Sequence, residues 1–134
     1  MADRIRQENY FLNTGDFLTI ECDKLYFGKT RVSNAAASNM KWAAIIKDTA
    51  TEADSNASVS IDSDTDPTRF DLNVGGTYPV LTVYLALSTE TDTMGAGIYH
   101  YEVWLYDTTT TNRQAILEGE ISIEDAIMVN LFTP

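Results

Sequence analysis

The sequence predicts an all-β protein, a single antiparallel β-sandwich of the immunoglobulin-like kind. Short runs of alternating apolar and polar residues recur along the chain, and turn-forming residues separate them, as is typical of sandwiches and barrels. Helical periodicity is nearly absent. The chain has 134 residues, of which 44% are hydrophobic and 22% charged. This size and composition indicate one globular domain with a real core rather than a disordered chain.

Three strands are expected in the first half of the chain. In TGDFLTIECD, a Gly-Asp turn precedes an alternating run at 17–22 whose apolar residues share one face. The run at 41–48, in MKWAAIIKD, is short and contains Trp and two Ile, and its alternation favours a strand. In ASVSID, the run at 59–61 again places its apolar residues on one face.

Two further strands follow in the middle of the chain. TRFDLNV alternates over 70–74 and stops at the glycine pair 75–76. TYPVLTVYLAL is the longest apolar run, and we expect a strand over 80–87 with Leu87 as the last residue of its more apolar face. Pro79 has no backbone N–H to donate to a sheet, so it belongs at the beginning of this strand.

A hairpin is expected at the end of the sandwich. GIYHYEVWLYD supplies a strand over 99–107, TTTTN supplies the connection, and RQAILEGEISIED supplies a strand over 114–123. In this second strand, Ile121 and Ile123 continue one face, while acidic and hydroxyl side chains line the other. The hairpin therefore has one face for the core and one that faces outwards.

Polar segments and the chain ends complete the expected organisation. The segments 29–39 and 48–58 are small, polar and without periodicity, so we expect loops. We divide the chain into an N-terminal arm or first strand at 1–12, the sandwich at 13–124 and an apolar C-terminal tail at 125–134. The start, MADRIRQENY, lacks the apolar region of a secretory signal, and we expect none.

Charge and cysteine content limit the classes of partner. Nine cationic and twenty anionic side chains give a net charge of −11, which speaks against nucleic acid, because phosphates are bound chiefly by Lys and Arg. No apolar run approaches the roughly 20 residues needed to span a bilayer, so we expect no membrane partner. The single cysteine, Cys22, excludes an intrachain disulfide and fits folding in a reducing cytoplasm.

Catalytic motifs are missing from the sequence. His100 is the only histidine, so it has no second histidine for a metal or catalytic cluster. A Cys22–His100 pair is formally available, but Cys22 falls on an apolar strand face, which favours a buried, inert thiol. No phosphate-binding loop, G-x-S-x-G or H-E-x-x-H pattern occurs. We therefore expect no enzyme activity, no catalytic residue and no cofactor.

The string IDSDTDP is the one metal-like pattern. Asp62, Asp64 and Asp66 alternate as at the start of a helix–loop–helix calcium loop. Such a loop needs Gly at its sixth position and Glu at its twelfth, where this chain has Pro67 and Asn73. The pattern favours a solvated acidic turn, and we expect no metal site.

The strand over 99–107 carries large side chains on both faces. Tyr99 stands two residues after Gly97, as in a tyrosine corner, whose hydroxyl ties the strand to a preceding connection. Tyr101 then takes the inward position of the second cysteine of an immunoglobulin domain. Trp104 and Tyr106 are left on the opposite face, together with His100. An exposed Trp is rare unless a loop or another subunit covers it.

These residues resemble a known family, the tail and baseplate proteins of bacteriophages, notably the N-terminal domain of upper baseplate proteins. The shared order begins with Gly-Asp and an alternating strand, here Gly15-Asp16 and FLTIEC, followed by a central strand, here MKWAAIIKD. It continues with G-x-Y-x-Y-x-V-x-L-x-D, here 97–107, and closes with L-x-G-x-[IFV]-x-[IV], here 117–123. The resemblance covers about residues 13–124.

The resemblance implies a non-enzymatic structural protein of a bacteriophage virion, made in the host cytoplasm, with no catalytic residues. Its expected partners are other virion proteins and copies of itself, in the tail, the baseplate or the fibre-attachment region. A capsid decoration protein is an alternative placement. A carbohydrate-binding sandwich for host-surface recognition is an alternative of another class, favoured by aromatics in a groove or at loop tips. For the C-terminal tail, packing on its own domain as a last strand is the alternative to a subunit contact. The residues expected to contact neighbouring subunits are His100, Trp104, Tyr106, Met128, Leu131 and Phe132.

Overall fold

The computed structural model describes residues 6–49 and 51–126. Its strands are β1 (Arg6–Gln7), β2 (Tyr10–Asn13), β3 (Leu18–Cys22), β4 (Tyr26–Phe27), β5 (Thr30–Arg31), β6 (Met40–Lys47), β7 (Val59–Asp62), β8 (Phe70–Asn73), β9 (Val80–Ala86), β10 (Gly97–Asp107) and β11 (Asn112–Glu124). Its helical segments are α1 (Asn34–Ala37), α2 (Ser88–Met94) and the 3₁₀ turns η1 (Asp54–Asn56) and η2 (Pro67–Arg69).

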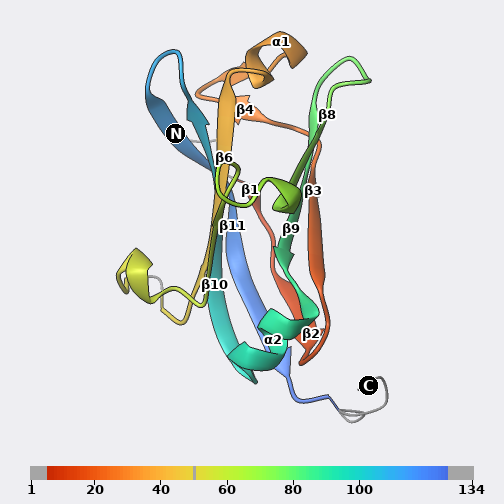
Figure 1. The fold of residues 1–134 in the computed structure, drawn as a ribbon, viewed down its shortest axis with the longest axis vertical. Helices are drawn as coiled ribbons and strands as arrows, with labels where there is room; N and C mark the ends of the chain where they lie inside the picture. Colours follow the sequence, from red (N-terminus) through yellow and green to blue (C-terminus); the bar gives the residue numbers. More distant parts are fainter. Residues whose placement is uncertain (1–5, 50, 127–134) are drawn as a thin grey trace.

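Two β-sheets pack face to face and form an immunoglobulin-like sandwich (Figure 1). The six-stranded sheet has the order β1-β11-β10-β6-β7, with β2 also paired to β11, and the three-stranded sheet has the order β3-β9-β8. Strands β3, β9 and β8 correspond to B, E and D of the immunoglobulin fold, and β6, β7, β10 and β11 to C, C′, F and G. The predicted fold class is confirmed. The short strands β4 and β5 form a separate ribbon in the connection between β3 and β6.

The first strand of the sandwich lies on β11 and is split into two pieces. Both β1 and β2 run parallel to β11, whereas the other paired strands are antiparallel. Between the two pieces, the Glu8 N–H donates to the Glu118 carbonyl at 3.0 Å, and the Tyr101 hydroxyl donates to the Glu8 carbonyl at 2.7 Å. A Cβ on Gly119 would lie 1.9 Å from the Glu8 carbonyl oxygen, so only glycine admits this close approach.

The side chain of Glu8 contacts both pieces of this first strand, at Arg6 of β1 and Tyr10 of β2. Its carboxylate forms an ion pair with Arg6, at 2.7 Å, and accepts a hydrogen bond from the Tyr10 hydroxyl. The hydrogen bond from Tyr10, with the nearby Arg6 guanidinium, holds the pKa of Glu8 below its ordinary value. Burial and the Glu8 carboxylate together raise the pKa of Tyr10 to about 12. Residues 6–13 are therefore part of the sandwich.

The core lies between the sheets and is built from the predicted alternation. Along β10, Tyr101, Val103 and Leu105 are at most 1% exposed and point inwards. Trp42 on β6 is 5% exposed, in the strand where immunoglobulin domains place their buried Trp. The predicted strands at 17–22, 41–48 and 59–61 are present, each within a residue or two of its predicted bounds.

Two predictions about the connections are wrong. The structure ends β9 at Ala86, and Leu87 is 41% exposed because it occupies the N-cap position of α2. The Glu90 carboxylate accepts the Leu87 N–H at 2.8 Å. This capping contact marks the N-terminus of a helix whose sequence has no apolar periodicity. The segment 29–39 is not simply a loop, because it contains β5 and α1, and the Ser33 hydroxyl caps α1.

Helix α2 closes the end of the sandwich between β9 and β10 (Figure 1). Arg69 donates to both carboxylate oxygens of Glu90, at 3.1 and 2.7 Å, and to the backbone carbonyls of Tyr84 and Leu85. The Tyr99 hydroxyl donates to the Met94 carbonyl at 2.5 Å and contacts that of Gly95 at 3.1 Å. The predicted tyrosine corner is confirmed, and it fixes the start of β10.

Candidate functional site

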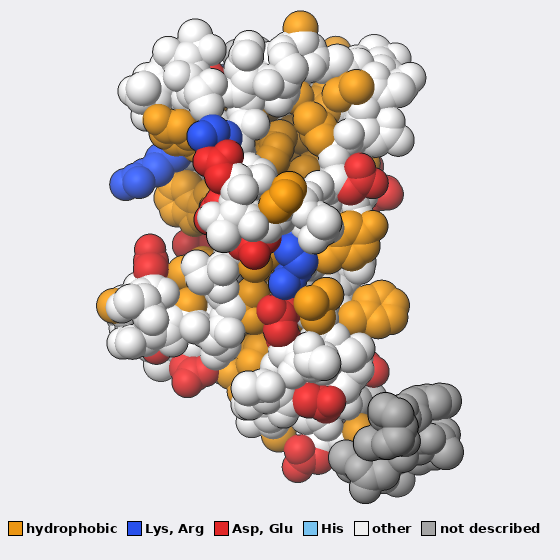
Figure 2. All heavy atoms as spheres, in the orientation of Figure 1, with side chains coloured by type: hydrophobic (Ala, Val, Ile, Leu, Met, Phe, Trp, Pro, Cys, Tyr) orange, Lys and Arg blue, Asp and Glu red, His pale blue; other side chains and the backbone are white. Residues whose placement is uncertain are grey.

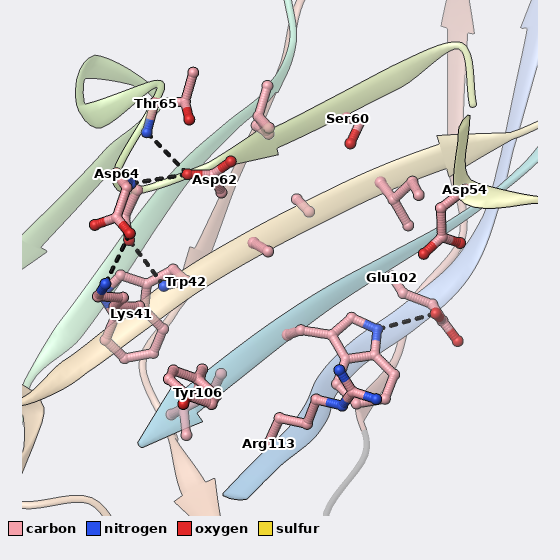
Figure 3. Close-up of a pocket in the computed structure, with 17 residues that line it drawn as sticks. Lys41, Trp42, Asp54, Ser60, Asp62, Asp64, Thr65, Glu102, Tyr106 and Arg113 are labelled. Atoms are coloured by element: carbon pink, nitrogen blue, oxygen red, sulfur yellow. Dashed lines mark hydrogen bonds and ion pairs between the residues drawn. The ribbon is translucent and has the colours of Figure 1, made fainter. Parts of the chain in front are cut away.

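An aromatic ridge follows the outer face of β10. Trp104 and Tyr106 point away from the core, and Tyr106 is 36% exposed while Trp104 is partly exposed. The indole N–H of Trp104 donates to the Glu102 carboxylate at 3.0 Å, the dashed line that ends at Glu102 in Figure 3. This bond uses the polar end of the indole and fixes the orientation of its ring. The ridge therefore has a fixed orientation although no residue in the described part of the chain covers it fully.

A groove lies beside the ridge, over β6 and β7 (Figure 3). Its volume is about 820 Å³. Between the outward Lys41 and Lys47 of β6 and the outward Asp62 of β7, the outward residues are small or of medium size, namely Ala43, Ile45 and Ser60. Because Ala43 pairs in register with Trp104, the smallest side chain of the floor lies directly beside the largest side chain of the ridge. This size difference between neighbouring strands creates the groove.

Charged side chains surround the groove, and nearly all have partners within the chain. Lys41 binds Asp64 at 2.8 Å, and the hydrogen bond to this carboxylate raises the pKa of Lys41. Lys47 binds Asp54 at 2.6 Å. Arg113 lies on β11, is exposed, and pairs in register with Tyr106 of β10. Within residues 6–49 and 51–126, the Arg113 guanidinium has neither an ion pair nor a hydrogen bond.

The acidic string at the end of β7 closes a turn. The Asp62 carboxylate accepts the N–H groups of Asp64, at 3.0 Å, and Thr65, at 2.8 Å (Figure 3). The Asp66 carboxylate accepts the Asp62 N–H at 3.3 Å, and the Asp66 N–H donates to the Asp62 carbonyl at 2.7 Å. These bonds occupy the backbone groups of the edge strand β7 at Asp62, which limits pairing with another strand. Among the described residues, no group of three or more potential ligands is placed to hold a metal ion.

The predicted contact residues fall in three places. Trp104 and Tyr106 lie together on the ridge, as expected from their spacing. His100 shares their face of β10 but lines a separate, smaller depression with Lys47 and Glu120. The predicted contacts of the C-terminal tail, at Met128, Leu131 and Phe132, lie outside the described residues.

Cys22 and His100 do not form a pair. Cys22 is 4% exposed on the inner face of β3, and burial raises the pKa of its thiol to about 11. His100 belongs to the other sheet and points outwards between the inward residues Tyr99 and Tyr101. A thiol that is buried and protonated at neutral pH is a poor nucleophile, as its place on an apolar strand face predicted.

Sequence reasoning missed Arg113 and the floor of the groove. Arg113 could have been found from the hairpin, because the short connection at 108–111 places it opposite Tyr106. The floor had a weaker signal, since the alternation of MKWAAIIKD assigns Ala43 to the outer face but does not say which strand lies beside it. Strand order came only with the structure.

The surface around these elements is acidic. Figure 2 shows Asp and Glu side chains scattered over the visible face, with few Lys and Arg side chains between them. At the far end of the outer face of the large sheet, Phe11 and Ile98 flank Ser122 in register, and they are 80% and 61% exposed. No helix in residues 6–49 and 51–126 is long and apolar enough to cross a membrane.

Comparisons with known proteins add little to this geometry. No protein-family model matches the chain, and no curated protein matches it. Among solved structures, the chain is similar to the extracellular fragment, including the stalk region, of novel immune-type receptor 11 from Ictalurus punctatus. The two are 12% identical, the alignment covers 99% of this chain and 95% of the other, and the TM-score is 0.36. A similarity this low carries no argument about function.

Proposed function

We propose that the chain is a non-enzymatic structural subunit of a bacteriophage virion that assembles through protein–protein contacts on the outer face of its large sheet. The observation that carries the proposal is the ordered aromatic ridge of Trp104 and Tyr106 beside an open groove. Large aromatic side chains at fixed positions are the usual anchors of protein interfaces. The virion setting rests on the resemblance of the runs at 97–107 and 117–123 to tail and baseplate proteins.

A second apolar pair on the same face supports docking over a broad surface. Phe11 and Ile98 are strongly exposed on this face, at the end opposite to Tyr106. Exposed large apolar side chains on one sheet face favour burial by another protein, because each contributes on the order of 1.5–3 kcal/mol when it is fully removed from water. Assembly in repeated copies would cover such a face through symmetric contacts.

Carbohydrate binding is the second candidate, because the aromatics lie beside a groove and aromatic rings stack on sugars. The polar groups of the groove argue against it. Asp64 is bound by Lys41, Asp54 by Lys47 and Glu102 by the Trp104 indole. Few groups are left to bind sugar hydroxyls, and we favour protein docking.

The place in the particle follows from the resemblance, which favours the tail, the baseplate or the fibre-attachment region over the capsid. Separating tails from capsids and measuring the chain in each fraction by mass spectrometry distinguishes these placements. The chain is expected in the tail fraction. Its presence on capsids alone would instead support the decoration role.

The function is tested by supplying tagged wild-type chain or Trp104→Ala during infection by the parent phage, with the native gene deleted. We expect wild-type chain in purified particles and at least about a tenfold loss of incorporation for Trp104→Ala, the effect of removing an interface anchor. Tyr84→Ala, which removes an exposed aromatic from the other sheet, is the matched control and should incorporate normally. The isolated Trp104→Ala domain should keep its thermal stability.

Two results would contradict the proposed structural role. The first is a chain that is absent from the particles. The second is a wild-type monomer that binds a glycan array and no virion protein. A large loss of thermal stability in Trp104→Ala would mean that Trp104 belongs to the core. The incorporation experiment would then be repeated with Trp104→Phe in place of Trp104→Ala.

A further inference from the structure

We propose that two copies of the chain pack face to face through the large sheet, each placing its Trp104–Tyr106 ridge in the groove of the other. The inference deepens the proposed function, because it rests on this face being a protein-docking surface and names a second copy as its occupant. Three properties of the face favour this pairing: the position of the ridge, the shape of the groove and the distribution of charge.

The ridge and the groove lie on neighbouring strands of one face. The ridge is on β10, the floor of the groove is on β6 and β7, and Trp104 pairs in register with Ala43. A two-fold axis that runs along the strands, between β10 and β6, exchanges these two strands. Trp104 of each copy then meets Ala43 of the other copy, so that the largest side chain of the face covers an alanine. Both contacts form at once, as an isologous interface requires.

The packing required is ordinary for β-sheets. An axis along the strands keeps the strands of the two copies roughly aligned, and aligned sheets pack at about 30° with a separation of about 10 Å. Side chains from the two faces interdigitate in this arrangement. An arrangement reversed end for end about an axis that crosses the strands at the Glu102–Glu118 pair is less favourable, because it places these two carboxylates against the same two carboxylates of the other copy.

The charges of the face agree with the same axis. Strand β11 lies beyond β10 and β7 lies beyond β6, so the axis also exchanges β11 with β7. Arg113, whose guanidinium has no ion pair or hydrogen bond within residues 6–49 and 51–126, then lies over the acidic turn of the other copy, which contains Asp62 and Asp64. Opposite charges therefore meet on both sides of the axis, where β11 of one copy faces β7 of the other, and the two aromatic ridges lie between these contacts.

The symmetry gives a test that uses two complementary variants of the purified chain. Trp104→Ala removes the ridge and keeps the groove, whereas Ala43→Trp fills the groove and keeps the ridge. Wild-type chain should sediment as a dimer, and each variant alone should associate at least about tenfold more weakly. An equimolar mixture should recover dimers, because the intact ridge enters the intact groove and the new Trp side chain fills the space left by the deleted one. Tyr84→Ala should behave as wild type.

Three outcomes overturn the inference: a wild-type chain that stays monomeric over the whole concentration range, variants that dimerise as wild type does, or a mixture that does not recover dimers. Thermal unfolding of each variant shows that it is folded, and Ala43→Phe replaces Ala43→Trp if it is not. The experiment needs no virion, so a failure of this inference leaves the incorporation test of the proposed function intact. If the chain dimerises but never enters particles, the proposed function is refuted and the inference of a dimer stands.

Discussion

Tyr99 and Tyr101 share the inner face of β10, and each uses its hydroxyl to hold a different part of the backbone. The Tyr99 hydroxyl donates to the end of α2, at Met94 and Gly95, and the Tyr101 hydroxyl donates to Glu8 in the first strand. Tyr101 also packs against the ring of Tyr10, with 5.9 Å between ring centroids. In the place of an immunoglobulin disulfide, this chain has a tyrosine whose hydroxyl reaches the first strand, at the edge of its own sheet.

Removing the Tyr99 hydroxyl should lower stability and leave the fold unchanged. For Tyr99→Phe we expect the free energy of unfolding to fall by about 0.5–1.5 kcal/mol, because the partly buried carbonyls at Met94 and Gly95 lose their donor. Denaturant unfolding measures the change. Tyr84→Phe is the control, since the exposed Tyr84 hydroxyl has no hydrogen bond within the described residues. Equal stability of the two variants would show that the tyrosine corner contributes nothing here.

At the scale of elements, the first strand depends on one glycine of β11. Residues 6–13 run along β11, and their bend at Glu8 approaches Gly119 too closely for any side chain. Besides the backbone bond from the Glu8 N–H to the Glu118 carbonyl, the side chains of Tyr101, Tyr10 and Arg6 all bind Glu8. The strand is therefore held by side chains at one point and by backbone pairing on either side of it.

Gly119→Ala should displace this strand. The added Cβ would lie 1.9 Å from the Glu8 carbonyl oxygen, which is backbone and must move, and we expect a loss of about 1–3 kcal/mol in the free energy of unfolding. Amide hydrogen exchange should accelerate at residues 6–13 before it does in β10. Gly76→Ala, whose Cβ would meet the Tyr78 carbonyl at an ordinary 3.8 Å, should change little. Unchanged exchange at residues 6–13 in Gly119→Ala would contradict this account of the strand.

Element by element, the alternation of the sequence was enough to predict β3, β6 to β11 and the inward position of Tyr101, because period-two burial is a local property, but it did not predict the short strands β4 and β5. It was not enough for α2, whose polar sequence forms a helix through Glu90 binding back to Leu87 and Arg69. The same limit applies to the site. Trp104 and Tyr106 were predicted to face outwards, but the groove depends on β6 lying beside β10, and strand order is a property of the whole fold.

For the whole molecule, the two sheets have unequal roles. The small sheet β3-β9-β8 mainly covers the core, whereas the large sheet presents its aromatic ridge, its groove and Arg113, which has no partner among the described residues, on the face away from the core. The acidic surface limits non-specific association, and the docking that we propose is assigned to this face. Both properties suit the proposed role of a virion subunit, which has to stay dispersed before it assembles.

The central claim, that the outer face of the large sheet is an assembly surface, is tested most directly by hydroxyl-radical footprinting. The purified chain, kept dilute enough to be monomeric, is compared with the same chain in intact particles of the parent phage. We expect Trp104 and Tyr106 to be oxidised in the isolated chain and protected several-fold in the particle, while the exposed Tyr84 on the other sheet is less affected. Equal oxidation of Trp104 and Tyr106 in the two states, with protection elsewhere, would contradict the claim.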